Sequence, residues 1–413
     1  MIWLLGGYTW LFIHRPFEVW PALGAWHVEK IYMIITILYW ALFAEKNWVS
    51  NRLNGRFLFF WIVVAAAWVV SPYVSACQQT GENYFKMVVL YILIISTVRT
   101  ERDLRFLVNA FLVSMALYMA HSLREYCAGR AVYRMGTTRM VAVDSTIGDP
   151  NSFAALIICS LPLLFAVWPL LRQSWQRGLA AGYVVLSATC VLLTGSRMGL
   201  LGLLALSAFI GLQSKRRLAI ILVLAIAAPV AWTFLPSDRK ERYMTIIDPS
   251  HGPANAQESA EGRTWGFLNG LKLLGERPVL GFGPGAFGKA IGNNTQAHNI
   301  YGQTLGETGA AGGLAFLGIV LGIVGNFFEA RRLFRADPEH SSAFCYRLSL
   351  SVLTTMILLL IMGWAGHFLY WAIWLWFGAY QAIALHCMRR DHLDRLEVAS
   401  AQCDNSLRVG ETV

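Results

Sequence analysis

Charged residues are scarce in this sequence of 413 residues: they make up only 14%, whereas 56% of the residues are hydrophobic. Soluble domains of ordinary composition contain about 25% charged residues. The scarcity of charge therefore excludes an ordinary water-soluble chain of this length and indicates a protein whose medium is lipid.

Metal-binding patterns and internal repeats are missing as well. The seven cysteines are scattered, and no two of them have metal-ligand spacing. Asp149 is an isolated acid at a turn, where it is expected to cap the following helix, and Asp238 is surrounded by basic residues. We therefore expect no metal and no cofactor.

The sequence does contain a series of apolar runs. A bilayer core about 30 Å thick is crossed by a helix of roughly 20 apolar residues. Twelve runs approach this length, at 1–14, 28–45, 57–74, 84–98, 104–122, 153–171, 178–194, 198–213, 218–235, 300–328, 348–364 and 368–387. The first lacks the basic start and cleavage site of a signal peptide, so we interpret it as a span. The sequence predicts an all-α, polytopic membrane protein of about 12 transmembrane helices.

Basic residues in the short loops indicate the topology, because Lys and Arg gather on the cytoplasmic side. With twelve spans, the basic clusters all fall on one side; they are Lys46 to Arg56, Arg99 to Arg105, Arg172 and Arg177, Lys215 to Arg217, Arg331 to Arg335, and Arg389 and Arg390. Both termini are therefore expected in the cytoplasm. The outer side has two long segments, 123–152 and 236–299. Cys77 and Cys127 fall in outer loops too, so a disulfide between them is an open alternative.

The chain is predicted to form one transmembrane domain over residues 1–390, followed by a polar cytoplasmic tail, 391–413, that is expected to be disordered. The outer segment 236–299 becomes regular near Glu261. Apolar residues then recur at helical spacing: Phe267, Leu268, Leu271 and Leu274. This pattern predicts short amphipathic helices on the membrane surface, although a helix packed on the protein shows the same pattern.

Arginines of the outer side are the first candidates for chemistry. Arg197 lies in a very short turn between two spans, within Thr194-Gly195-Ser196-Arg197-Met198-Gly199. Snorkelling to the headgroups is the simplest role for such an arginine. Arg263 and Arg139 fall on the same side, however, so several guanidinium groups are able to converge on one phosphate, which they bind in a two-pronged geometry.

A glycine-rich run lies in the second outer segment, at Gly281-Phe282-Gly283-Pro284-Gly285-Ala286-Phe287. Such a run allows a tight turn with its backbone N–H groups turned outward, which makes Gly281 and Gly283 candidates for substrate binding. A sharp turn that only returns the chain to the membrane explains the run equally well. It is not a dinucleotide fingerprint, because it does not join a strand to a helix beside a cytoplasmic cofactor.

Polar residues open the tenth predicted span. His298 precedes it, and Asn299, Gln303 and Glu307 recur at a spacing of four, which places them on one helical face. Because polar groups are costly in lipid, we expect this face to point to the interior or to a polar cavity. A second set at the same spacing would let a neighbouring helix approach closely: Gly302, Gly306 and Ala310.

These motifs resemble the O-antigen ligase and polymerase superfamily. The resemblance covers about residues 134–330. The matching strings follow in the expected order: Gly148-Asp149-Pro150-Asn151, Thr194 to Gly199, Arg263-Thr264-Trp265, Arg277-Pro278 with Gly281 to Gly285, His298-Asn299, and Glu307-Thr308-Gly309. Each string also falls on the expected side of the membrane.

The resemblance implies a bacterial inner-membrane glycosyltransferase that moves a glycan from undecaprenyl diphosphate to an acceptor hydroxyl at the periplasmic face. Arg197 and Arg263 would then hold the diphosphate, and His298 would contact or activate the acceptor. The other expected substrate-binding residues are Arg139, Asn151, Ser196, Gly281, Gly283, Asn299, Gln303 and Glu307. Cations for the leaving group and a base for the acceptor suffice for this chemistry without a metal.

The acceptor and the reaction class stay open at this stage. A ligase would use lipid A core as its acceptor, and a repeat-unit polymerase would use a growing glycan. A protein O-glycosylation ligase would use a protein hydroxyl. Nucleic acid is not expected as a partner. A transporter or flippase is the alternative from another class, but such proteins usually show interrupted spans in matching halves and charges near the midplane. Here Glu307 is nearly alone within the spans, and no two halves match.

Overall fold

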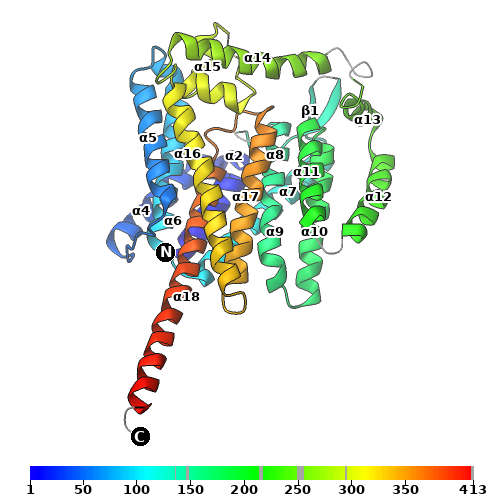
Figure 1. Cartoon of the computed structure of the whole chain (residues 1–413). Helices are drawn as coiled ribbons and strands as arrows, with labels where there is room; N and C mark the ends of the chain where they lie inside the picture. Colours follow the sequence, from blue (N-terminus) through cyan, green and yellow to red (C-terminus); the bar gives the residue numbers. More distant parts are fainter. Residues whose placement is uncertain (135, 146–147, 214–216, 249–254, 294, 411–413) are drawn as a thin grey trace.

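The computed structural model describes residues 1–413 except 135, 146–147, 214–216, 249–254, 294 and 411–413 (Figure 1). It is a bundle of helices, and every predicted apolar run is largely helical. The mainly α-helical class is therefore confirmed.

The first part of the chain consists of helices followed by one β-hairpin. The helices are α1 (Ile2–His14), α2 (Pro16–Val19), α3 (Pro21–Ala25), α4 (Val28–Leu42), α5 (Arg52–Val69), α6 (Val74–Thr97) and α7 (Glu101–Cys127). The hairpin pairs β1 (Ala131–Arg134) with β2 (Thr137–Met140), antiparallel, with Ala131 opposite Met140.

The second part is helical throughout its regular structure. Its elements are α8 (Pro150–Ser160), α9 (Pro162–Val167), the 3-10 turn η1 (Trp168–Leu170), α10 (Ser174–Leu193), α11 (Arg197–Gln213), α12 (Arg217–Phe234), α13 (Ser237–Met244), α14 (Asn255–Glu276), α15 (Phe287–Ala290), α16 (Ile300–Ala336), α17 (Ala343–Gly363) and α18 (Ala372–Gly410). The predicted span 153–171 is divided after Ser160, because Pro162 cannot donate a backbone hydrogen bond.

The structure supports a multi-pass membrane protein, but with fewer clear spans than predicted. Within the described residues, six helical units are long and apolar enough to cross a membrane: α5, α7, Pro150–Leu170, α10, α16 and α17. Two shorter apolar helices follow one another, α11 and the part of α12 from Ile221 to Phe234. The number of about 12 is not confirmed, since α1 and α4 are short and α6 begins with polar turns.

Two predicted outer loops contain regular structure instead. β1 and β2 lie in the outer segment 123–152, so the chain is not purely α-helical; alternation along β2 buries Thr137 and Arg139 on one face. Residues 75–83 are the first turns of α6. Gly81 within these turns lets the ring of Trp68 pack against α6, because a Cβ at this position would lie 2.4 Å from that ring.

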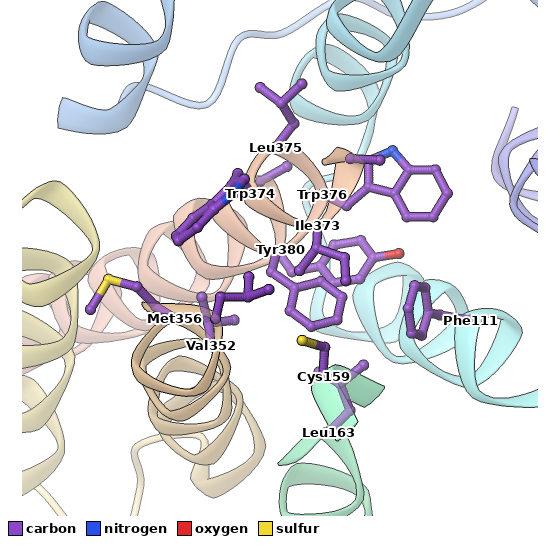
Figure 2. Close-up of a cluster of buried hydrophobic side chains, with 14 of the residues drawn as sticks. Phe111, Cys159, Leu163, Val352, Met356, Ile373, Trp374, Leu375, Trp376 and Tyr380 are labelled. Carbon is purple, nitrogen blue, oxygen red and sulfur yellow. The ribbon is translucent and has the colours of Figure 1, made fainter. Parts of the chain in front are cut away.

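The main hydrophobic core lies where α7, α8, α9, α17 and α18 meet. Figure 2 shows its side chains, with Phe111 of α7 facing Trp376 and Tyr380 of α18 and with Cys159 and Leu163 below them. The ring of Phe111 lies edge-to-face with that of Phe377 at a centroid distance of 5.2 Å. This packing joins α7 to the beginning of α18 and to the end of α8, and both α8 and α18 begin beside the site described below.

α14 lies across one end of the bundle, hereafter the α14 end (Figure 1). Glycines allow the close approach: a Cβ added at Gly266 would lie 1.8 Å from the carbonyl oxygen of Ala297, and one at Gly270 would lie 2.4 Å from Cα of Gly302. The small-residue contact predicted at Gly302 is thus confirmed. Leu268 and Leu271 of the predicted amphipathic pattern are 57% and 41% exposed, so their face is turned away from the protein.

The C-terminal segment extends the last helix beyond the bundle. α18 continues as a helix to Gly410 and projects beyond the end of the bundle opposite α14 (Figure 1). Arg395 pairs with Asp337 and also donates to the backbone carbonyl of His340. These contacts hold the start of the projecting segment against the connection between α16 and α17, and the sequence gives no sign of them.

Candidate functional site

The turn between α10 and α11 forms the centre of the site at the α14 end. Gly195 has a φ of 60°, in the left-handed region that favours glycine. Ser196 caps α11, because its hydroxyl accepts a hydrogen bond from the N–H of Gly199 at 3.2 Å. Arg197 is the first residue of α11. The predicted site residue Ser196 is fully buried and so supports the turn from within.

Arg197 and Arg242 join this turn to α13. Arg197 donates from Nη1 to the hydroxyl of Thr245 at 3.1 Å and is 9% exposed. Thr245 directly follows α13, and Arg242 of the same helix donates from Nε to the carbonyl oxygen of Gly195 at 2.7 Å. Each arginine therefore binds the segment that positions the other.

Arg263 of α14 is the third arginine of this cluster. Burial, followed by the charges of Arg197 and Arg242, lowers the pKa of Arg263 to about 10, so it stays protonated at neutral pH. Like charges that act on one another are costly unless an anion lies between them. We call Arg197, Arg242 and Arg263 the arginine cluster; it is suited to a phosphate-bearing ligand.

The hairpin brings Arg139 to the back of the same turn. Arg139 is 1% exposed and donates from Nε to the carbonyl oxygen of Thr194 at 2.7 Å and from Nη2 to Oδ1 of Asn151 at 2.8 Å. Asp149 caps α8, as predicted: its carboxylate accepts from the N–H groups of Asn151 and Ser152, both at 3.0 Å. Arg139 and Asn151 thus join the hairpin, the turn and α8.

His298 and Asn299 connect α16 to the cluster. His298 has a φ of 46°, which is rare for a residue with a side chain, and its imidazole is exposed at the α14 end. Asn299 caps α16 and donates from Nδ2 to the carbonyl oxygens of Arg263 at 3.4 Å and Trp364 at 3.3 Å. The histidine and the arginine cluster are therefore held to each other through the backbone of α14.

A second histidine, His367, lies against His298. Their ring centroids are 5.3 Å apart, and the rings meet edge-to-face at 66°. His367 belongs to the connection between α17 and α18. Burial, and then the charge of His298, lower the pKa of His367 to about 4, against the opposing effect of Asp149, so the ring is neutral at neutral pH. Its Nδ1 is buried and has no hydrogen-bond partner among the described residues.

The turn, the arginine cluster and His298 all belong to one continuous segment of the chain. Residues 182–317 match the family model described as O-antigen ligase. The match confirms the resemblance to the O-antigen ligase superfamily. No curated protein matches the chain. Arg139, Asn151 and His367 lie outside the matched residues, and the fold brings them to the O-antigen ligase segment from both sides.

Within the O-antigen ligase segment, the glycine-rich run docks on α16. The N–H of Gly283 donates to the carbonyl oxygen of Glu307 at 2.8 Å, and the N–H of Gly281 donates to that of Arg277 at 3.1 Å. α16 has a break at Gly309, where φ is 63°, and the N–H of Ala310 donates to Pro278 instead at 2.8 Å. The N–H groups of Gly281 and Gly283 thus donate hydrogen bonds to the protein's own backbone. This agrees with the alternative interpretation of the run as a structural turn.

Gln303 and Glu307 contact the glycine-rich run and the connection between α17 and α18. They share one face of α16, as predicted, and both are buried; Nε2 of Gln303 donates to Oε2 of Glu307 at 3.4 Å. The Glu307 carboxylate also interacts with Tyr370 and with the backbone of Gly285 and Phe287. These contacts brace the glycine-rich run against the connection between α17 and α18, which carries His367.

The cysteines do not form the disulfide that the sequence left open. Cys77 and Cys127 are both free thiols. Cys77 is buried in α6, where its Sγ contacts Oγ of Ser71 at 3.3 Å, and Cys127 is exposed at the end of α7. In the part of the chain that the structure describes, no three His, Cys, Asp or Glu side chains are grouped to hold a metal.

Sequence reasoning missed Arg242 and His367. Arg242 is one of several charged residues near Ser237–Met244, and only the short helix α13 distinguishes it by turning Arg239 and Arg242 toward the hairpin and the turn. His367 lies in the short connection after α17, where nothing in the local pattern distinguishes it from an interfacial residue. A signal for either would have required the three-dimensional contacts.

Proposed function

We propose that the protein is a glycosyltransferase of the bacterial inner membrane that transfers a glycan from undecaprenyl diphosphate to a hydroxyl group at the periplasmic face. One observation carries the proposal: Arg197, Arg242 and Arg263 converge beside His298 at one end of a membrane helix bundle. A lipid-linked diphosphate presents its charge at this depth, next to the headgroups.

The arginine cluster would bind the diphosphate and stabilise it as a leaving group. When the bond between the anomeric carbon and the phosphate oxygen breaks, the electron pair stays on that oxygen and its charge increases. Guanidinium groups bind two phosphate oxygens in a fork, and preorganised cations stabilise developing charge without further rearrangement. Three arginines fixed by the turn, α13 and α14 meet this need, and we propose that no metal takes part.

His298 would accept the proton of the acceptor. The acceptor oxygen forms a new bond to the anomeric carbon while its proton passes to the imidazole. The exposure of His298 leaves room for an acceptor, and its link through Asn299 to the backbone of Arg263 fixes the distance between base and leaving group. The ring of His367, which packs edge-to-face on that of His298, would help to orient the imidazole toward the acceptor.

The remaining predicted residues would support the elements that carry the arginine cluster and His298. Arg139, Asn151 and Ser196 hold the turn that carries Arg197. Gly281, Gly283, Gln303 and Glu307 hold α16 and the loop behind His298. Lipid A core, a growing glycan and a protein are the acceptor classes to compare, corresponding to a ligase, a polymerase and a protein O-glycosylation ligase.

The proposal is tested with the purified protein in liposomes. A fluorescent glycan on undecaprenyl diphosphate is supplied with each acceptor class in turn. We expect the label to move to one acceptor with release of undecaprenyl diphosphate, and we expect Arg263→Ala to abolish the transfer. Movement of the labelled lipid across the bilayer without any transfer would instead indicate the transporter alternative.

A further inference from the structure

A cavity of about 160 Å³ lies apart from the arginine cluster, between α1, α4, α6, α7, α8 and α18. Apolar side chains form most of its lining, among them Phe12, Phe111, Trp371 and Trp376. No residue of the arginine cluster lines it. Aromatic walls of this kind accommodate a hydrocarbon chain, and tryptophan is common where a membrane core meets the headgroups.

Three charged residues line the same cavity: Arg15, Glu29 and Lys86. Arg15 forms an ion pair with Glu18 at 3.0 Å, and the Glu18 carboxylate also accepts from the backbone N–H of Ser145 at 2.8 Å. Arg15 has a φ of 50°, a strained conformation that these contacts maintain. The guanidinium is therefore fixed at the cavity, and its Nε has no hydrogen-bond partner among the described residues.

Lys86 is the less expected cation. It is half-buried, and in the described part of the chain it forms no ion pair, although Glu29 lines the same cavity. Lys86 lies where the polar first turns of α6 give way to the apolar run from Met87 to Ile95. A lysine at such a boundary is costly beside hydrocarbon unless an anion or water meets it.

The three charges come from three different segments that meet at the cavity. Arg15 directly follows α1, Glu29 lies in the first turn of α4, and Lys86 lies at the polar end of the apolar part of α6. The apolar lining residues Leu156 and Ile373 come from the middle of α8 and the first turn of α18, the helices that begin beside the site. The lining of the cavity thus combines charged and apolar side chains. A lipid with a phosphate likewise combines a charged headgroup with an apolar chain.

We propose that this cavity binds a phosphate-bearing membrane lipid, with one hydrocarbon chain against the aromatic walls and the phosphate between Arg15 and Lys86. Glu29 then accepts a hydrogen bond from a hydroxyl or amine of the headgroup. The site is a second lipid site, separate from the arginine cluster. Its ligand is either an isoprenyl phosphate or a glycerophospholipid, since both offer this chemistry.

Photolabelling of the full-length protein in lipid nanodiscs tests the proposal. One sample contains an isoprenyl phosphate with a diazirine in its chain, and the other contains phosphatidylglycerol with a diazirine in its acyl chain. We expect at least one probe to label peptides containing Phe12 or Trp371 to Trp376. Lys86→Gln is expected to reduce this labelling about tenfold, because a hydrogen bond to a charged group is lost.

Matched variants separate this site from general lipid contact and from the proposed function. Lys30→Gln removes an exposed lysine of α4 that does not line the cavity, and labelling should not change. Ala372→Leu fills the cavity without removing a charge and should also reduce labelling. Arg197→Ala should leave labelling intact although transfer is lost. Labelling spread evenly over the lipid-facing helices, or unaffected by both Lys86→Gln and Ala372→Leu, would overturn the proposal.

Discussion

Arg242 donates a hydrogen bond from Nε to the carbonyl oxygen of Gly195, 2.7 Å away, in the turn that leads into Arg197. Arg197 in turn donates to Thr245, which directly follows the helix of Arg242. The two arginines thus hold each other's backbone in place. Loss of either one is expected to loosen the whole cluster, and this makes Arg242 as important as the two arginines that the sequence points to.

We predict that Arg242→Ala lowers glycan transfer by roughly 10² to 10³, the usual effect of removing one preorganised donor to a developing anion. Arg242→Lys should restore little, because lysine cannot keep the bond to Gly195 and bind phosphate in a fork. Lys240→Ala in the same helix is the control, since its ammonium group contacts the carbonyl oxygen of Thr233 instead. Transfer rates at matched protein levels measure the effect, and equal rates for Arg242→Ala and Lys240→Ala would contradict it.

The glycine-rich run permits a prediction about stability. A Cβ at Gly283 would lie 2.6 Å from Sγ of Cys77 and 2.8 Å from Ser71, and the φ of 101° is unfavourable for alanine. Gly283→Ala should therefore lower the free energy of unfolding by about 2 to 4 kcal/mol. At Gly292 the φ is also positive, but a Cβ there would meet open space. Gly292→Ala should therefore introduce backbone strain alone and lower the free energy of unfolding by about 1 kcal/mol. Thermal unfolding in detergent measures both; an equal loss would show that packing at Gly283 is unimportant.

The sequence predicted the parts of this molecule that depend on composition and short spacing. Apolar runs located the helices, and turn chemistry located the cap at Asp149. Asn299, which the spacing of four placed on a helical face, is instead the N-cap of α16. The motifs named Arg197, Arg263 and His298, which the fold does bring to one end of the bundle. Their roles remain proposals.

The rest depended on contacts between distant segments, which no local pattern records. Gly281 and Gly283 were candidates for substrate binding because the sequence shows N–H groups in a tight turn but not the carbonyl oxygens of Arg277 and Glu307 that accept from them. Arg139 was predicted to bind substrate from its place in an outer segment; its contacts with Thr194 and Asn151, which follow from the pairing of the hairpin, are not visible in the sequence. His367 meets His298 only after α17 has returned across the bundle.

The buried ring of His367 predicts a pH dependence of stability. Its pKa is about 4 in the folded protein and near 6.5 otherwise, so the folded state binds fewer protons between these values. Stability should be complete above about pH 6.5 and should decline as the pH falls toward 4. His367→Phe removes this titration and should reduce the decline by on the order of 1 to 3 kcal/mol. Unfolding temperatures of both proteins at pH 7 and pH 4.5 test this, and identical declines would contradict it.

The predicted topology is tested with single cysteines in a background that lacks the exposed Cys127. Tyr133 is 75% exposed in the hairpin, and Asn293 is exposed beyond α15, both at the α14 end. We expect Tyr133→Cys and Asn293→Cys to react with a membrane-impermeant maleimide from the periplasm. Glu339→Cys and Leu393→Cys should react only after the membrane is opened. Labelling of Asn293→Cys from the cytoplasmic side alone would place the arginine cluster on the wrong face for this function.

The central claim is that arginines bind the diphosphate while His298 activates the acceptor, and the most direct test is single-turnover transfer measured together with donor binding. We expect His298→Ala to slow transfer by roughly 10² to 10⁴ while donor binding is kept. Arg197→Lys and Arg263→Lys should slow transfer by roughly 10² to 10³ and weaken donor binding as well. Chelators should have no effect. Full transfer in both Arg197→Ala and His298→Ala, at matched protein levels, would contradict the account.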